Sequence, residues 1–386
     1  MSHLRNNRFR FWVLVSIVAV SGFSQGMLLP LIAVIFENSG VSSFLNGLHA
    51  TALYIGILLA SPFMEHPLRK YGYKPIIVCG GLLVLVSLAL FPLWKTFWFW
   101  FFLRLLIGIG DHALNFGAQT WITHFSPEHK RGRNIALYGL FFGIGFAVGP
   151  LLVPLVDINE NLPFIISSVL SFMGWLCLLS LTNEFPEQNV GMNHWGESFY
   201  RFAKAWKIAW VAFLPPLAYG FLETSLNGSF PVYALRIGLD VNNVSTLLVA
   251  FALGGIIFQL PLGMISDKLG RSNVLLGALF LGFVFFCMAA MLETSFVSLL
   301  ICLFIAGMFV GSTFSLGISY MTDLMPKNLL PTGNLLCGVC FSFGSLIGPS
   351  IGGLAIETLH SISFFSIISL LFFVVFLLTL YKRVKT

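Results

Sequence analysis

Runs of about twenty apolar residues, separated by short polar segments, recur along the whole chain. A helix needs about 20 apolar residues to cross the hydrocarbon core of a bilayer, because each residue rises by only about 1.5 Å. The chain is 57% hydrophobic and 9% charged, whereas soluble domains carry about 25% charged residues. The pattern predicts an all-α membrane protein with twelve transmembrane helices. They are expected at residues 10–36, 43–64, 74–93, 97–124, 133–155, 162–182, 207–236, 242–266, 272–292, 296–323, 330–356 and 360–382.

The basic residues indicate how these spans are oriented. Of the 21 Lys and Arg residues, all but three fall in alternate loops and in the two tails. Lys95 and Arg236 fall on the opposite side, and Arg104 falls within a span. Because Lys and Arg are enriched in cytoplasmic loops, both termini are predicted to be cytoplasmic. We therefore expect a multi-pass protein of the cell (plasma) membrane whose net charge of +6 reflects its topology and not nucleic-acid binding.

A glycine-proline motif occurs twice, 199 residues apart. Its two copies are Gly145, Gly149 and Pro150, and Gly344, Gly348 and Pro349. Other glycines and prolines repeat at nearly the same offset, which indicates an internal duplication. We expect two pseudo-symmetric six-helix bundles, at residues 1–182 and 207–386, joined by a cytoplasmic linker at residues 183–206. The end of this linker is either an amphipathic helix on the bilayer surface or a plain connecting loop.

The same motif predicts how its two helices pack. Glycines four residues apart allow two helix backbones to approach closely, which stabilises helix association in lipid. The proline that follows removes an intrahelical hydrogen bond and bends the helix. The fifth and eleventh spans are therefore expected to be bent helices that pack tightly against a neighbour.

The loop between the eighth and ninth spans carries the most specific local motif, GMISDKLGR. Its key residues are Gly263, Asp267, Lys268, Gly270 and Arg271. It resembles the G-x-x-x-D-(R/K)-x-G-(R/K) loop of the major facilitator superfamily, and the twelve spans in two repeated halves extend this resemblance over essentially the whole chain. The resemblance implies a transporter that works by alternating access. In the copy between the second and third spans, Arg69 occupies the position of Asp267, so the acidic latch that the family carries there is absent.

Two further segments resemble motifs of the drug:proton antiporter group of this superfamily. GFAVGP, from Gly145 to Pro150, resembles the fifth-helix motif of the antiporters, although the full G-x-x-x-G-P-x-x-G-G form stands in the eleventh span. RLLIGIG, starting at Arg104, resembles the fourth-helix arginine motif that is linked to proton coupling. The resemblance implies that Arg104 promotes proton release from a nearby acid. The alternative is an arginine that only ties its helix to the carbonyls of a neighbour.

Three ionisable side chains stand out within the spans: Arg104, Asp111 and Glu223. A charge at the bilayer centre costs about 2.5–3.5 kcal/mol on insertion scales, so these residues are candidates for proton coupling. Arg104 and Asp111 are about two helical turns apart, roughly 10 Å along the axis, so each needs another partner. Glu223 is the strongest candidate for a proton carrier, or for the anchor of a cationic substrate. The alternative is a neutral carboxyl group hydrogen-bonded between helices.

Polar and aromatic residues around these positions are predicted to line a substrate cavity. They are Gln25, His112, Asn115, Gln119, Tyr219, Phe221 and Asn227. Aromatic walls with one or two carboxylates suit an amphipathic or cationic small molecule. We predict a proton-coupled exporter of such molecules. Uptake or facilitated transport of a small metabolite or metal chelate is the alternative, and lipid translocation is a second one.

The sequence shows no pattern that predicts enzymatic chemistry. It contains no nucleophile–base pair, no metal-ligand spacing and no Walker-type glycine loop. All six cysteines fall in predicted spans, and the pair Cys337 and Cys340 lacks a second pair with which to bind a metal. We expect no enzyme activity, cofactor or metal. The expected partners are a small-molecule substrate, protons and the lipid bilayer, with no nucleic acid, and the protein is expected to be a monomer.

Overall fold

The computed structural model describes residues 2–185, 195–326, 329–359 and 362–385, and this part of the chain is helical, without β-strands. Within it, twelve helical spans are long and apolar enough to cross a membrane. The all-α class with twelve membrane helices is thereby confirmed. Residues 186–194 of the predicted linker and the basic residue at position 327 lie outside the described ranges.

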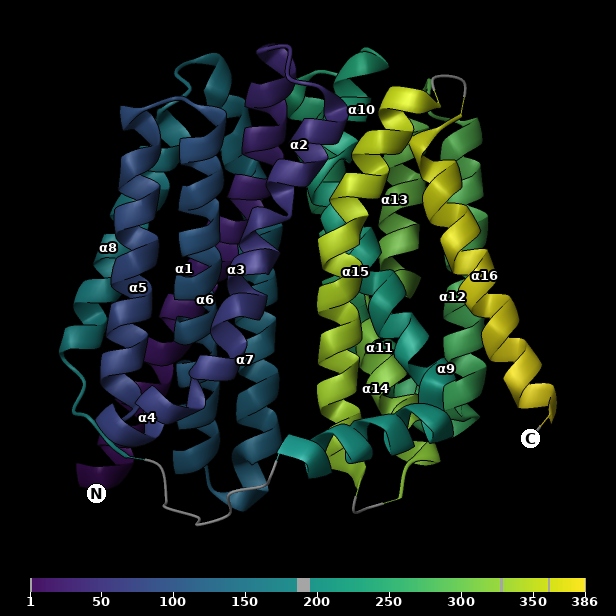
Figure 1. Ribbon diagram of the computed structural model, residues 1–386. Helices are drawn as coiled ribbons and strands as arrows, with labels where there is room; N and C mark the ends of the chain where they lie inside the picture. The colour runs from purple at the N-terminus through teal and green to yellow at the C-terminus, as the bar shows by residue number, and fades with distance from the viewer. Residues whose placement is uncertain (1, 186–194, 327–328, 360–361, 386) are drawn as a thin grey trace. The chain divides into compact units, whose positions relative to one another are not determined.

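The chain divides into two compact units, of which the first comprises Met1–Ile35 and His49–Asn189. Its elements, labelled in Figure 1, are α1 (Ser2–Asn38), α3 (Ala52–Ala60), η1 (Ser61–Phe63), α4 (Glu65–Tyr71), α5 (Tyr73–Leu90), η2 (Phe91–Leu93), α6 (Phe97–Phe125), α7 (Glu128–Val148), η3 (Gly149–Asp157) and α8 (Leu162–Leu179). Helix α6 packs against α3 and α5, and α5 also packs against α8.

The second unit comprises Phe36–Leu48 and Val190–Thr386. Its elements are α2 (Ser43–Ala50), α9 (Trp195–Gly228), α10 (Phe230–Arg236), α11 (Val241–Leu269), α12 (Arg271–Met291), α13 (Phe296–Val310), α14 (Thr313–Leu324), α15 (Leu330–Thr358) and α16 (Phe364–Lys385). Helix α9 packs against α14 and α15, α11 against α13, and α12 against α13 and α16. The short segment that links α1 to α3 is thus grouped with the second unit.

The two units share a packing plan. The contacts of α6 with α3 and α5 recur as the contacts of α13 with α11 and α12. The contact of α5 with α8 likewise recurs between α12 and α16. The helices that correspond in this way are those that the 199-residue offset in the sequence relates.

Several spans depart from a plain α-helix, and three of them do so near their middle or at a kink. The fifth span changes at Gly149 from the α-helix α7 to the 3-10 helix η3, because Pro150 and Pro154 each lack an amide proton for the helical hydrogen bonds. The eleventh span carries Pro349 as the single proline in the interior of α15 and stays α-helical there. The tenth span is divided between α13 and α14, and α9 is interrupted at Ala209, whose φ and ψ are −130° and 27°.

The end of the predicted linker is helical. It forms the first part of α9, before the interruption at Ala209, and Figure 1 shows it running across the ends of the neighbouring helices. The start of the linker is attached to the first unit through Glu184. This carboxylate accepts hydrogen bonds from Arg10 Nη1 at 2.6 Å and from Trp121 Nε1 at 2.9 Å. The Arg10 guanidinium also lies 5.1 Å from the centre of the Trp121 ring, a cation–π contact.

Candidate functional site

Helix α6 carries Asp111 into the interior of the first unit, where the residue is 1% exposed. The hydroxyl of Ser21, on α1, donates a hydrogen bond to Asp111 Oδ1 at 2.7 Å. The side chain of Gln25, one turn further along α1, also interacts with this carboxylate. Asp111 Oδ2 has no hydrogen-bond partner among the described residues. The carboxylate is therefore held by α1 and keeps one oxygen able to accept a further hydrogen bond.

A chain of hydrogen bonds extends this site to α7. Asn115 donates from Nδ2 to Ser21 Oγ at 3.1 Å and to the backbone carbonyl of Asp111 at 2.9 Å. The hydroxyl of Tyr138, on α7, donates to Asn115 Oδ1 at 2.8 Å. The structure thus brings together Asp111, Asn115 and Gln25, all named from the sequence, and adds Ser21 and Tyr138, which the sequence reasoning missed.

The sequence held a signal for one of the two missed residues. Ser21 precedes Gln25 by four residues, so both lie on one face of α1. A polar pair at this spacing in an apolar span marks a face that is turned toward other polar groups. Tyr138 has no comparable signal, because aromatic residues occur throughout these spans.

Arg104 also lies on α6 and is fully buried. Its Nη1 lies 2.9 Å from His49 Nδ1, and its Nη2 donates to the backbone carbonyl of Leu28 at 3.1 Å. Its Nε has no partner, and the side chain forms no ion pair with any described residue. Arg104 thus contacts α1 and the end of α2, and Asp111 contacts α1 two turns away. These contacts have the geometry of an arginine that ties its helix to its neighbours.

His112 points away from Asp111, its neighbour in sequence. Its Nε2 lies 3.1 Å from the hydroxyl of Ser61, at the start of η1, and its ring stacks on Phe116 with 6.2 Å between the ring centres. The separation follows from the helix, since successive residues are about 100° apart around its axis. Gln119, two turns further along α6, is exposed. The polar residues predicted on α6 therefore face different surroundings.

Glu223 lies on α9 in the second unit and is half-buried. Its carboxylate forms no hydrogen bond or ion pair with a described residue. Asn227, one turn later, is buried and donates a hydrogen bond to the backbone carbonyl of Glu223 at 2.7 Å. This bond does not involve the Glu223 carboxylate. Glu223 thus differs from Asp111, whose carboxylate is fixed by a hydrogen bond.

Three aromatic rings gather one turn before Glu223. Tyr219 lies 6.5 Å from Phe314, on α14, and 6.2 Å from Phe341, on α15. Phe314 and Phe341 are themselves 5.2 Å apart, in an edge-to-face arrangement (distances between ring centres). Because residues four apart share a helix face, Tyr219 and Glu223 lie on the same side of α9. Phe221 is buried, and its backbone lies against Gly344 and Gly348 of α15.

The glycines of the repeated motif lie where two helix backbones meet. A Cβ atom at Gly145 would overlap the backbone carbonyl oxygen of Ala19, on α1. A Cβ atom at Gly344 would overlap the carbonyl oxygen of Leu217, on α9. Helices α7 and α15 therefore approach α1 and α9 at backbone contact. These close approaches fix the two helices that carry Ser21 and Glu223.

The G-x-x-x-D-x-x-G-R loop connects α11 to α12 through Gly270, whose φ of +90° favours glycine. Arg271 Nη1 donates to Asp323 Oδ1 at 2.9 Å and to the backbone carbonyl of Ser319 at 3.0 Å, near the end of α14. A cation at this end stabilises the helix. Asp267 is exposed and interacts with Arg271 Nε at 3.8 Å.

The matching loop of the first unit uses another cation and another helix. Gly72 has a φ of +88°. Lys74 Nζ donates to the carbonyls of Leu179 and Leu181 at 2.8 and 2.6 Å, at the end of α8. The loop whose acidic residue is replaced by Arg69 therefore still caps a neighbouring helix.

The described residues offer no obvious metal centre. No group of three or more His, Cys, Asp or Glu side chains among them is arranged to hold a metal ion. The six cysteines form no disulfide.

The family model and the relatives that match this chain all carry the same family description. The model described as "Major Facilitator Superfamily" matches residues 14–240 and 216–386. The chain is 56% identical over 364 residues to "Uncharacterized MFS-type transporter YfkF" of Bacillus subtilis (strain 168), covering 94% of this chain and 93% of that protein. It is 23% identical over 367 residues to "Uncharacterized MFS-type transporter YcaD" of Shigella flexneri, covering 92% and 94% of the two chains.

Solved structures show the same fold at low sequence identity. The nucleoside transporter NupG matches with a TM-score of 0.77 and 13% identity, covering 96% of this chain and 98% of that one. A mutant of the peptide transporter POT matches with a TM-score of 0.76 and 14% identity, covering 97% and 94%. At these identities the likeness concerns the fold alone.

Proposed function

The chain belongs to the Major Facilitator Superfamily and is a transporter of this type, and from this premise we propose that it is a proton-coupled exporter of amphipathic or cationic small molecules. The carboxyl group of Glu223 carries the proposal. It lies within a membrane span, half-buried, with no hydrogen bond or ion pair to a described residue. Such a placement costs about 2.5–3.5 kcal/mol on insertion scales, so a chain retains it for a function.

Glu223 suits the role of proton carrier better than Asp111. A carrier must reach water from each side of the membrane in turn, and Glu223 is partly exposed whereas Asp111 is 1% exposed. The Asp111 carboxylate also accepts a hydrogen bond from the Ser21 hydroxyl, which fixes it to α1. We assign Asp111 a supporting role in coupling. Arg104 positions α6 against α1 by its bond to the Leu28 carbonyl.

The aromatic rings beside Glu223 support the proposed substrate class. Tyr219, Phe314 and Phe341 offer ring faces that attract organic cations. A proton and a cationic substrate then compete for one carboxylate, which is how an antiporter exchanges them. A one-for-one exchange of a proton for a monovalent cation moves no net charge, so the pH gradient drives it and supplies about 1.4 kcal/mol per pH unit.

The direction of transport is tested in vesicles of known orientation. Ligands are first selected from lipophilic cations, nucleosides and small peptides by thermal stabilisation of the purified protein, because binding to the folded state raises its stability. A proton gradient is then imposed across proteoliposomes, and movement of the selected ligand is followed. Export by antiport predicts that substrate moves against the direction of proton flow. Accumulation on the side that receives protons would establish uptake instead.

The orientation of the chain is part of the proposal. Both termini and the basic loops are placed on the cytoplasmic side, following the distribution of Lys and Arg. Single cysteines introduced in a cysteine-free variant, one near Lys382 and one at Asn159, are labelled in intact cells with a membrane-impermeant reagent. We expect labelling at position 159 alone. Labelling at the C-terminal position alone would reverse the orientation.

A further inference from the structure

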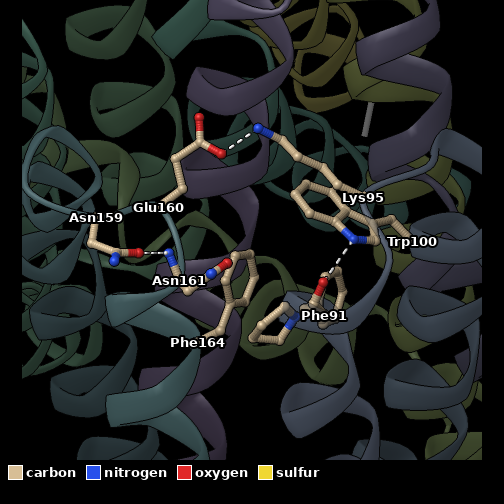
Figure 2. A pocket seen from close by; sticks show the side chains of 8 residues that line it. Phe91, Lys95, Trp100, Asn159, Glu160, Asn161 and Phe164 are labelled. Carbon is tan, nitrogen blue, oxygen red and sulfur yellow. Dashed lines mark hydrogen bonds and ion pairs between the residues drawn. The ribbon is translucent and has the colours of Figure 1, made fainter.

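A cavity of about 350 Å³ opens at one end of the first unit, about three helical turns along α6 from Asp111. It lies between the segment that joins α5 to α6 and the segment that joins η3 to α8 (Figure 2). This end is opposite to the one where Arg10 contacts Glu184 and Lys74 caps α8. The volume falls within the range of about 300–1,000 Å³ that small-molecule sites occupy.

The wall of the cavity is aromatic and firmly packed. Phe91 and Phe164 stack with their ring centres 4.8 Å apart, and Trp100 lies 5.7 Å from Phe164. The Trp100 indole donates a hydrogen bond to the Phe91 carbonyl at 3.1 Å, as Figure 2 shows. Trp100 and Phe164 are at most 3% exposed. The cavity is therefore shaped before any ligand binds.

The rim of the cavity carries one positive and one negative charge. Lys95 Nζ and Glu160 Oε2 form an ion pair across it, and each side chain is 47% exposed. Asn159 and Asn161 lie beside Glu160, with Asn159 Oδ1 accepting from the Asn161 amide at 2.9 Å. Because an exposed ion pair contributes little to stability, a ligand with both charges could replace each partner at small cost.

The related corner of the second unit holds different contacts. At an offset of 199 residues, Glu293 and Ser363 correspond to Trp94 and Phe164. There the hydroxyl of Tyr233, on α10, donates to Glu293 Oε2 at 2.7 Å, and its ring lies 5.8 Å from that of Phe364. The Lys95–Glu160 ion pair has no counterpart in the repeat, because the positions 199 residues later hold Thr294 and Leu359.

Large, exposed apolar side chains stand near the lining residues in the sequence, at the same end of the first unit. Leu93 and Trp94 adjoin Lys95 in sequence, Ile158 adjoins Asn159, and Trp98 stands in the first turn of α6. Their exposed fractions are 74% for Leu93, 63% for Trp94, 75% for Ile158 and 72% for Trp98. Exposed tryptophans at the end of a membrane span are typical of the lipid–water interface. The cavity thus opens at the level of the lipid headgroups.

We propose that this cavity binds the headgroup of a zwitterionic phospholipid with a primary ammonium, such as phosphatidylethanolamine. Lys95 binds the phosphate and Glu160 binds the ammonium, so the ligand takes the place of the ion pair. An anionic headgroup would leave Glu160 facing a negative charge. A trimethylammonium group could not donate hydrogen bonds to the carboxylate. Leu93, Trp94 and Ile158, which stand beside the lining residues in the sequence, bind the upper part of the acyl chains, which a soluble zwitterion lacks.

The proposal is tested by lipid binding to delipidated protein. Short-chain phosphatidylethanolamine, phosphatidylcholine and phosphatidylglycerol are titrated, with O-phosphoethanolamine as the probe without acyl chains, and binding is read by native mass spectrometry. The full chain should bind phosphatidylethanolamine about tenfold more tightly than the other probes, as expected for the gain of one charge-assisted hydrogen bond. Glu160→Gln should reverse the order in favour of phosphatidylglycerol. Lys95→Gln should weaken binding of all three lipids.

Two controls separate binding from folding. Tyr233→Phe, at the related corner of the second unit, should leave the lipid order unchanged. Unfolding temperatures without lipid are measured for every variant, and a photoreactive phosphatidylethanolamine should crosslink to peptides that contain residues 91–100 or 158–164. The same lipid order in all variants, or crosslinks confined to other peptides, would overturn the proposal. Equal affinity for O-phosphoethanolamine would show that the ligand is a soluble zwitterion and not a lipid.

Discussion

In the first unit, the unbroken helix α6 carries Arg104 and Asp111 through the interior, whereas the related positions of the second unit are Leu303 and Val310. The second unit divides this span between α13 and α14 around Gly311. It places its own ionisable residue, Glu223, on α9, where the first unit has Gln25 on α1. Each half of the duplication therefore holds a carboxyl group, but on a different helix.

The contrast shows which features the duplication has kept. The backbone contacts made by Gly145 and Gly344 are the same in both units, since each glycine meets a carbonyl of the helix that begins its own half. The polar interior is not shared. Packing is thus common to both halves, whereas the charges differ, and function in a repeated transporter concentrates where the halves differ. The predictions below test these shared and unshared features in turn.

The largest effect is expected at the shared glycine contacts. Gly145→Ala and Gly344→Ala each force a Cβ onto a backbone carbonyl, so the helices must separate, at a cost of about 1–3 kcal/mol or more. Gly139 and Gly338, on the same two helices and also 199 residues apart, have no atom within 4 Å of the added Cβ. Their alanine variants should be neutral or slightly stabilised, by up to about 1 kcal/mol. Thermal unfolding in detergent checks this, and equal destabilisation of all four variants would contradict it.

Exchanging a polar residue for its repeat counterpart should have the next largest effect. Asp111→Val removes the acceptor of the Ser21 hydrogen bond inside the first unit, and a buried donor left unsatisfied costs about 1–3 kcal/mol. Asp111→Asn keeps an acceptor and should lose less than half as much. Both are compared by unfolding temperature. The reciprocal change Val310→Asp, at the unpartnered position, should destabilise the second unit, and a neutral outcome there would show that the two interiors are interchangeable.

A smaller effect is expected at the corner of the second unit where Tyr233 contacts Glu293. Burial raises the pKa of Tyr233 to about 12 from its ordinary value of 10. The folded chain therefore holds the phenolic proton more tightly than the unfolded chain, and this stabilisation is complete below pH 10 and is lost between pH 10 and 12. Tyr233→Phe should cost about 1 kcal/mol at neutral pH, through the lost bond to Glu293. It should also flatten the fall in stability between pH 10 and 12, and an unchanged alkaline profile would count against the assignment.

The smallest effect is expected where each unit caps a helix with a cation. Lys74→Met removes the hydrogen bonds to two carbonyls at the end of α8, and Arg271→Met removes those at the end of α14. Each loss should be about 0.3–1 kcal/mol and should shrink with added salt. Lys70→Met serves as the control near Lys74. A loss that does not respond to salt would mean that packing, and not charge, holds these loops.

The sequence was sufficient for the spans and for part of the site. Twelve apolar runs predicted twelve helices, because the length of each run matches the bilayer and few charges interrupt it. Asp111 and Glu223 were found because a charge in such a run is rare. The hydrogen bond from Ser21 and the one from Tyr138 depend on how α1, α6 and α7 are rotated, which periodicity does not fix in helices that are apolar on all sides.

The local departures from regular helices were harder to predict. The change to a 3-10 helix at Gly149 follows from Pro150 and Pro154 together, whereas a single proline at Pro349 leaves α15 helical. The interruption at Ala209 has no glycine or proline at its position and was not expected. The sequence also did not predict that residues 36–48 group with the second unit. This grouping depends on contacts distant in sequence, such as the hydrogen bond from the Phe44 backbone amide to the Glu357 carboxylate.

The central claim, that Glu223 couples protons to transport, is tested most directly by comparing two kinds of flux for Glu223→Gln in proteoliposomes. One is substrate movement driven by a proton gradient, and the other is counterflow of labelled against unlabelled substrate without a gradient. Glu223→Gln should lose at least about 100-fold of the gradient-driven flux, as is typical when a proton-transferring group is removed, and should retain counterflow, while Asp111→Asn keeps both measurable. Gradient-driven transport at the wild-type rate in Glu223→Gln would contradict it.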